Sequence, residues 1–178
     1  MSQVPRYEPH YTVADYRRWP GDWELWSGRA IAMTPSPFGR HQNVLAALLT
    51  RLRVEIDRLG CKATALSELD WIVSDDTVVR PDVVVICGGV PERHLDSPPA
   101  LVAEVLSPSA RHHDLIFKRD LYAQQGVGIY LIIDPDAQTV EHLSLGSDHQ
   151  YAAVDQGEQL ELQVCDECEI KFDVRRLF

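Results

Sequence analysis

The sequence of 178 residues contains no long apolar segment. No apolar run approaches the roughly 18 residues that a membrane-spanning helix requires. Residues 1–11 are polar and lack the apolar core of a signal peptide. We therefore expect a cytoplasmic protein that does not contact a membrane. Its hydrophobic content of 45% suits one globular domain over residues 1–178.

Cysteine is scarce, and four scattered residues are too few to indicate a disulfide framework. They are Cys61, Cys87, Cys165 and Cys168. Cys165 and Cys168 have the CxxC spacing of half a zinc site, but no second such pair accompanies them. The pattern favours reduced, structural thiols, and metal binding by Cys165 and Cys168 stays open.

Positive charge is also scarce, because 17 Lys and Arg face 27 Asp and Glu, for a net charge of −10. Such a chain has no general electrostatic affinity for polyanions. A nucleic-acid function would need a local basic patch or a metal ion bridging to phosphate. The G-x-S-x-G motif of one class of serine hydrolases is absent as well, which argues against Ser/His acyl hydrolysis.

The hydrophobic pattern predicts a mixed α/β (α+β) fold, with helices packed on a mixed β-sheet. Apolar residues at three- and four-residue spacing predict a long helix over 39–59, ended by Gly60. Shorter helices are expected after residue 12 and over about 114–125. Strands are predicted in a hairpin over 23–34 and over 63–73, 78–86, 101–106, 129–133, 139–145 and 160–164. The segment 101–133 reads as a βαβ unit with a right-handed crossover.

Two carboxylates lie within otherwise apolar runs of strand length. Asp82 follows Pro81 at the entry of one strand, and Glu104 lies inside Leu101–Leu106. Burying a charged carboxylate costs several kcal/mol unless it is paired or binds a metal. Because the strands could be neighbours, these residues predict a site for Mg²⁺ or Mn²⁺, with the carbonyl of Val105 as a third ligand.

Simpler explanations remain open for both carboxylates. Asp82 could pair with its neighbour Arg80, and Glu104 could form a buried salt bridge with Arg80, Lys118 or Arg119. Lys118 could itself form an ordinary exposed pair with Asp114, four residues earlier on the predicted helix. In the functional alternative, the Lys118 ammonium would lie beside the metal and assist an attacking water.

The chain resembles the Uma-two family of bacterial restriction endonucleases, within the PD-(D/E)XK nuclease superfamily. The residues that carry this resemblance are Pro81-Asp82, Glu104-Val-Leu-Ser-Pro-Ser109, Asp114, Lys118, Leu121-Tyr122-Ala123, Gly126-Val127, Tyr130 and Asp134-Pro135. It extends upstream to Glu24-Leu25, Gly28, Pro35-Ser-Pro37 and His41, and so covers about residues 12–145. The resemblance implies a restriction-endonuclease-like sheet and a metal-dependent nuclease site.

The sequence departs from the superfamily pattern at one position. The lysine that usually follows the second carboxylate by two residues is replaced by Leu106. The resemblance implies that Lys118 supplies this ammonium from the following helix. It also makes Glu24 a candidate auxiliary carboxylate, although a solvent-facing strand residue would look the same in sequence.

Two basic residues are candidate phosphate contacts. His41 begins the long helix and could contact a phosphate or the metal, or it could simply support the helix end. Arg111, beside His112 and His113, lies in a predicted loop that could face phosphates.

The leading hypothesis is an endonuclease that hydrolyses the phosphodiester bonds of DNA. Asp82 and Glu104 would bind the metal, Lys118 would assist water, and Glu24 would be auxiliary. A homodimer is expected because cutting both strands requires two sites, and two-fold symmetry matches the duplex. The alternative is a catalytically inactive nuclease-fold protein that binds or regulates a partner, which the acidic composition favours.

Overall fold

A six-stranded sheet lies at the centre of the computed structural model, which describes residues 9–33, 39–107, 114–166 and 168–178. The strand order is β10-β9-β8-β7-β6-β3, in which β7 and β8 run parallel and the other neighbouring pairs are antiparallel. The strands are β3 (Ala63–Ser67), β6 (Val83–Cys87), β7 (Leu101–Val105), β8 (Ile129–Asp134), β9 (Thr139–Leu145) and β10 (Tyr151–Ala153).

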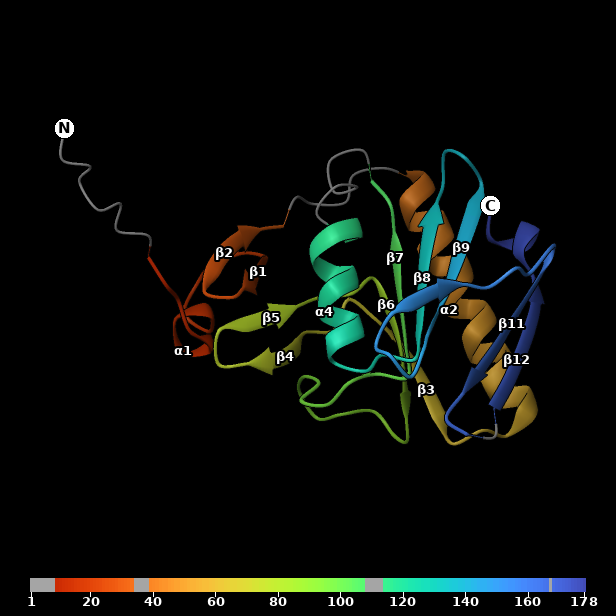
Figure 1. Cartoon of the computed structure of the whole chain (residues 1–178), viewed down its shortest axis with the longest axis horizontal. Coiled ribbons are helices and arrows are strands. Elements are labelled where there is room, and N and C mark those ends of the chain that lie inside the picture. The colour runs from red at the N-terminus through yellow and green to blue at the C-terminus, as the bar shows by residue number, and fades with distance from the viewer. Residues whose placement is uncertain (1–8, 34–38, 108–113, 167) are drawn as a thin grey trace.

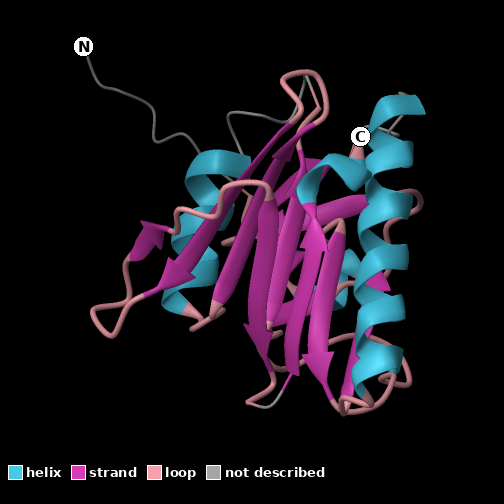
Figure 2. Cartoon of the chain, turned by 90° about the vertical axis from the view of Figure 1, so that its right-hand side faces the viewer, coloured by secondary structure: helices cyan, strands magenta, loops and turns pink. Residues whose placement is uncertain are grey.

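Helices cover both faces of this sheet (Figures 1 and 2). On one face lies α2 (Gly39–Leu59). A hairpin of β11 (Gln159–Val164) and β12 (Cys168–Asp173) and the short η2 (Val174–Leu177) pack beside it. On the other face lie the π-helical η1 (Asp114–Lys118) and α4 (Arg119–Gln124). Successive side chains of β7 point to opposite faces of the sheet: Ala103 and Val105 pack toward α2, and Val102 packs toward α4.

A second, smaller sheet lies beside α4, on the side away from α2 (Figure 1). Its order is β2-β1-β5-β4, formed by β1 (Trp23–Trp26), β2 (Arg29–Ala32), β5 (Thr77–Val79) and β4 (Trp71–Ser74). The short helix α1 (Val13–Tyr16) packs against it through Val13. Within the described residues, no helix has the length and apolar character needed to cross a membrane.

The predicted fold class and most predicted elements are confirmed. The long helix has the predicted bounds, and Gly60 ends it with a φ of +66°. Two predicted strands are each divided between the two sheets. Segment 63–73 is broken at Glu68, whose φ is +51°, and segment 78–86 is broken near Pro81, which cannot donate a main-chain hydrogen bond. The parallel β7–β8 pair confirms the βαβ unit, while its handedness stays a prediction.

The prediction of reduced thiols is wrong. Cys61 is bonded to Cys168, and Cys87 is bonded to Cys165. The partners lie 107 and 78 residues apart in sequence, so their proximity follows from the strand β12, which the sequence analysis did not predict. One bridge attaches the β11–β12 hairpin to the end of β6, and the other attaches it to the segment between α2 and β3. Bridges across such long loops typically stabilise a fold by roughly 2–4 kcal/mol.

His142 on β9 generates a prediction about acid stability. Its side chain is buried, and its Nδ1 atom has no hydrogen-bond partner among the residues that the structure describes. Desolvation lowers the pKa of His142 below 6.5, and the Gln156 side chain offsets this only in part. The unfolded chain therefore binds a proton more readily than the folded chain, so the free energy of unfolding falls as the pH drops through about 6.5.

We expect the variant His142→Gln to lose less stability than the wild type between about pH 7 and pH 5, measured by urea denaturation. The variant His149→Gln, at an exposed histidine, is the control. An equal pH dependence in wild type and His142→Gln would contradict the assignment.

Candidate functional site

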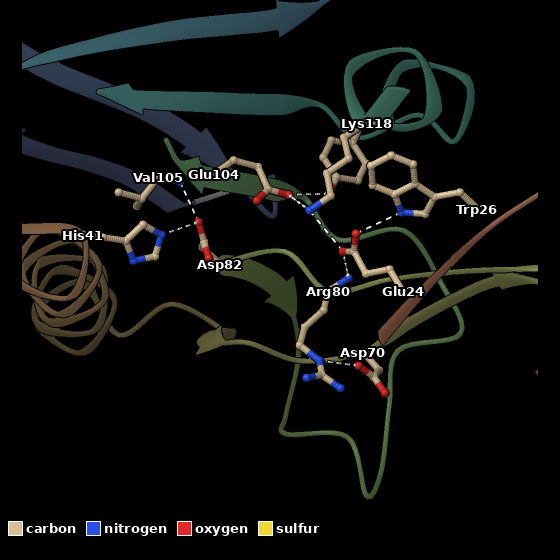
Figure 3. A network of polar contacts seen from close by, with 10 residues as sticks. Glu24, Trp26, His41, Asp70, Arg80, Asp82, Glu104, Val105 and Lys118 are labelled. Atoms are coloured by element: carbon tan, nitrogen blue, oxygen red, sulfur yellow. Dashed lines mark hydrogen bonds and ion pairs between the residues drawn. The ribbon is translucent and has the colours of Figure 1, made fainter. Parts of the chain in front are cut away.

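Asp82 and Glu104 lie at the same end of two paired strands. Val83 of β6 is opposite Ala103 of β7, so Asp82, one residue earlier, and Glu104, one residue later, are neighbours across the strands. Asp82 is also joined directly to β7, because its Oδ2 accepts a hydrogen bond of 2.7 Å from the N–H of Val105. The two residues are therefore opposite each other on neighbouring strands (Figure 3), and their sharing of one metal ion stays a prediction.

Asp82 contacts His41 as well. The His41 Nε2 atom lies 3.4 Å from Oδ2 of Asp82, and the histidine is buried at the first turn of α2. Burial alone would lower the pKa of His41. The hydrogen bond and negative charge of Asp82, together with the backbone of Val105, outweigh burial and raise it. His41 therefore contacts two of the three predicted metal ligands.

Glu104 is paired with Lys118 on the other face of the sheet. The Lys118 Nζ atom lies 3.0 Å from Oε1 of Glu104 and 3.1 Å from Oε1 of Glu24. Lys118 is 4% exposed, and Glu24 and Glu104 are each 3% exposed. Of the explanations left open for Glu104, the salt bridge to Lys118 is the one observed. It brings both residues into one site with Glu24.

The second sheet positions Glu24. Leu25 of β1 pairs with Val78 of β5, which places Glu24 close to the residues that follow β5. Glu24 Oε1 accepts a bond of 2.7 Å from the N–H of Arg80, and Oε2 accepts one of 2.9 Å from Nε1 of Trp26. Glu24 is thus a buried carboxylate with several donors rather than a solvent-facing residue. Glu24 contacts Lys118, and its auxiliary role in the site stays a prediction.

Arg80 does not neutralise Asp82. Its Nε donates to Asp70 and its Nη1 donates to Asp22, both at 2.7 Å (Figure 3 shows the contact with Asp70). The Arg80 guanidinium therefore fixes the segment that follows β5, while the main-chain N–H of Arg80 positions Glu24. The pairing of Asp82 with Arg80 that the sequence left open is not the one observed.

Tyr122 is a member of the site that sequence reasoning did not assign. Its hydroxyl donates to Oε1 of Glu104 at 2.7 Å, and its ring is fully buried between Trp71 and Tyr130. Burial, followed by the negative charge of Glu104, raises the pKa of Tyr122, so the phenol remains a donor. The signal was its position four residues after Lys118, which places both on one side of a helix.

Leu106 and Lys118 lie on the same face of the central sheet. Leu106 packs in the apolar cluster between β7 and α4, on the face that also receives the Glu104 side chain. Lys118 is the last residue of the π-helical turn over that face. Stacking of Phe117 on Trp26, with ring centres 4.3 Å apart, joins this turn to β1. The ammonium therefore reaches Glu104 from the covering helix.

A pocket of about 360 Å³ opens beside His41. It is lined by residues 39–41 of α2, by 106–107 after β7 and by 135–136 after β8. Arg40 at its edge forms an exposed ion pair of 3.2 Å with Asp136. Arg111, the other predicted phosphate contact, lies outside the described residues, as do His112 and His113.

The side chain of Asp114 is likewise outside the described part of the structure, so its predicted pairing with Lys118 stays a prediction. No group of three or more His, Cys, Asp or Glu side chains among the described residues is arranged to hold a metal ion. The site does carry excess negative charge, because Asp82, Glu104 and Glu24 outnumber the single ammonium of Lys118. That charge attracts cations.

Comparison with known proteins places this site in a family. The family model Uma2, described as "Putative restriction endonuclease", matches residues 13–175. The chain belongs to the Uma2 family. A solved structure with the same fold is described as a "putative nuclease belonging to DUF820" from Anabaena variabilis ATCC 29413. It is 20% identical in sequence with a TM-score of 0.75, and the match covers 94% of this Uma2 chain and 97% of the other. No curated protein matches the chain.

The buried ion pairs of the Uma2 chain generate a stability prediction. In Lys118→Met, Glu24 and Glu104 would face each other without the intervening ammonium. Because removing one partner leaves uncompensated buried charge, we expect the free energy of unfolding to fall by about 3 kcal/mol or more.

The matched control is Arg40→Met, which removes the cation of an exposed pair and should cost no more than about 1 kcal/mol. Urea denaturation at neutral pH measures both. Equal effects in the two variants would show that Lys118 is not the buried counter-ion of these carboxylates.

Proposed function

We propose that this Uma2 protein is a metal-dependent endonuclease that hydrolyses phosphodiester bonds of DNA. The observation that carries the proposal is the meeting of Asp82 and Glu104 at the ends of paired strands, with the Lys118 ammonium bonded to Glu104. Membership of a family described as restriction endonucleases supports the reaction class.

The donor set of the site fits Mg²⁺ or Mn²⁺. Two carboxylates and a main-chain carbonyl are hard oxygen donors, and Mg²⁺ commonly binds proteins through one or two carboxylates and several waters. Asp82, Glu104 and the carbonyl of Val105 would hold the ion, and His41 lies next to Asp82 and Val105. A bound divalent ion supplies an acidified water and neutralises phosphate oxygens.

The protein's own side chains would then orient the reactants. The Lys118 ammonium, fixed between Glu24 and Glu104, presents positive charge beside the carboxylate ligand and would stabilise charge that develops on the phosphate. Glu24 acts as a positioning residue, because its oxygens are engaged by Arg80, Trp26 and Lys118. Tyr122 fixes the orientation of Glu104 through one oxygen.

DNA would approach through the pocket at the start of α2, where His41 and Arg40 lie. With a net charge of −10, the chain as a whole does not attract a polyanion, so binding would depend on this region and on the metal. A two-fold homodimer would present two such sites to the two strands.

One observation favours a second candidate function. Lys118 contacts two carboxylates, and Asp82 contacts His41 and Val105. A network that only stabilises the fold would make the same contacts. A nuclease fold retained for binding a partner protein would have this arrangement too. Metal binding separates the two functions.

We expect the purified protein to cut plasmid DNA with Mg²⁺ or Mn²⁺ and not in the presence of a chelator. Asp82→Asn and Glu104→Gln remove a charged ligand with little change of shape, and each should reduce the rate to roughly 1% of wild type or less. Glu161→Gln, at an exposed carboxylate on β11, is the matched control and should cut normally. Unchanged cleavage by both site variants would refute the site assignment.

The positioning role of Glu24 predicts a different response. Glu24→Gln weakens the anchor of Lys118 without removing a proposed metal ligand, so kcat should fall about 10- to 100-fold. Calorimetric titration with Mn²⁺ should give nearly the same Kd as for wild type, whereas Asp82→Asn should abolish binding. A large loss of Mn²⁺ affinity in Glu24→Gln would make Glu24 a metal ligand instead. No binding by wild type at millimolar Mn²⁺ would favour the non-catalytic function.

A further inference from the structure

The two disulfides bring all four cysteines to one corner of the fold, at the opposite end of β6 from Asp82. Cys87 ends β6, and its strand partner Ala63 lies two residues after Cys61. Cys165 and Cys168 flank the turn of the β11–β12 hairpin, where Val164 pairs with Cys168. The two disulfides join these two places, so the hairpin turn is attached twice to the edge of the sheet.

The two bridges differ in exposure. Cys87 is exposed and Cys165 is half-buried, so the Cys87–Cys165 bridge lies at the surface. In the other bridge, Cys61 is half-buried and Cys168 is 1% exposed, which hinders attack from solvent at the Cys168 sulfur. Access governs how fast an external thiol attacks a disulfide. An external thiol would therefore open the Cys87–Cys165 bridge first.

From this arrangement we infer that the corner is a thiol–disulfide exchange site for small monothiols, in which opening of the Cys87–Cys165 bridge leads to opening of the less exposed Cys61–Cys168 bridge. Cys165 and Cys168 have the CxxC spacing that forms a disulfide in oxidoreductases. Once released, the Cys165 thiolate is only three residues from Cys168 along the chain, which gives it a high effective concentration.

The exchange balances in three steps. A thiolate RS⁻ attacks Sγ of Cys87, and Cys165 leaves as a thiolate. Sγ of Cys165 then attacks Sγ of Cys168, and Cys61 leaves as a thiolate that takes up a proton. A second monothiol attacks the mixed disulfide on Cys87 and releases RSSR. Two RSH are thus oxidised to RSSR, and two protein disulfides become one Cys165–Cys168 disulfide and two thiols, Cys61 and Cys87.

The product has a changed attachment of the hairpin. Before exchange, two covalent bonds attach β11–β12 to the sheet, and afterwards the bond lies within the hairpin. The hairpin would remain in place through its apolar side, formed by Leu160, Leu162, Val164, Ile170 and Phe172, which are buried against α2 and its neighbours. The exchange site therefore controls whether the β11–β12 hairpin is covalently attached to the rest of the fold.

Alkylation followed by tryptic mapping tests the relay. Cleavage after Arg58, Lys62, Arg93, Arg119 and Lys171 places Cys61, Cys87 and the Cys165/Cys168 pair on three separate peptides. With limiting 2-mercaptoethanol, a neutral monothiol, Cys61 and Cys87 should become alkylated while residues 120–171 retain an internal disulfide. Alkylation of Cys165 without any Cys165–Cys168 bond would overturn the inference.

A matched pair of variants isolates the internal attack. Cys87→Ser leaves Cys165 as a free thiol beside the Cys61–Cys168 bridge, and the double variant Cys87→Ser/Cys165→Ser leaves the bridge alone. Without added thiol, Cys61 should become alkylated in the single variant at least ten times faster than in the double variant. Equal protection of Cys61 in both would overturn the relay, and the wild-type mapping decides the question if a variant does not fold.

Discussion

The buried ammonium of Lys118 is the interaction on which the rest of the site depends. It lies between Glu24 and Glu104, which come from different sheets. It therefore connects the smaller, four-stranded sheet to the central sheet. None of these charges could remain buried without the others, because uncompensated charge in an apolar interior costs several kcal/mol. The same contact leaves the site with a net negative charge next to Asp82, which is the electrostatic condition for binding a divalent cation.

Much of this arrangement could be predicted from single residues. Glu104 is a carboxylate in an apolar strand and therefore requires a cation, which identified Lys118 as a candidate partner. Pro81 placed Asp82 at a strand entry, and β-alternation placed Glu104 on the face opposite to Val105. The 39–59 helix followed from its apolar periodicity, since a continuous stripe over six turns leaves little ambiguity.

Other features depend on contacts between distant segments, which periodicity does not encode. The two disulfides required knowing that β12 pairs with β11 and lies near the end of β6. In sequence, Tyr122 is indistinguishable from any buried aromatic residue, and only the structure shows that its hydroxyl donates a hydrogen bond to Glu104. The division of 78–86 into β5 and β6 places Arg80 between the two sheets; Pro81 marked the strand entry, but the pattern did not show that the two strands belong to different sheets. Membership of the Uma2 family, described as "Putative restriction endonuclease", then agreed with the resemblance that the sequence motifs carry.

The central claim is that Asp82 and Glu104 share one hard cation. A crystal of the protein soaked with Mn²⁺ and measured at an anomalous wavelength tests it directly. The account predicts one anomalous peak within about 2.0–2.3 Å of oxygens from both carboxylates. Density at neither residue at saturating Mn²⁺, with Glu104 still bonded to Lys118 and Tyr122, would contradict it.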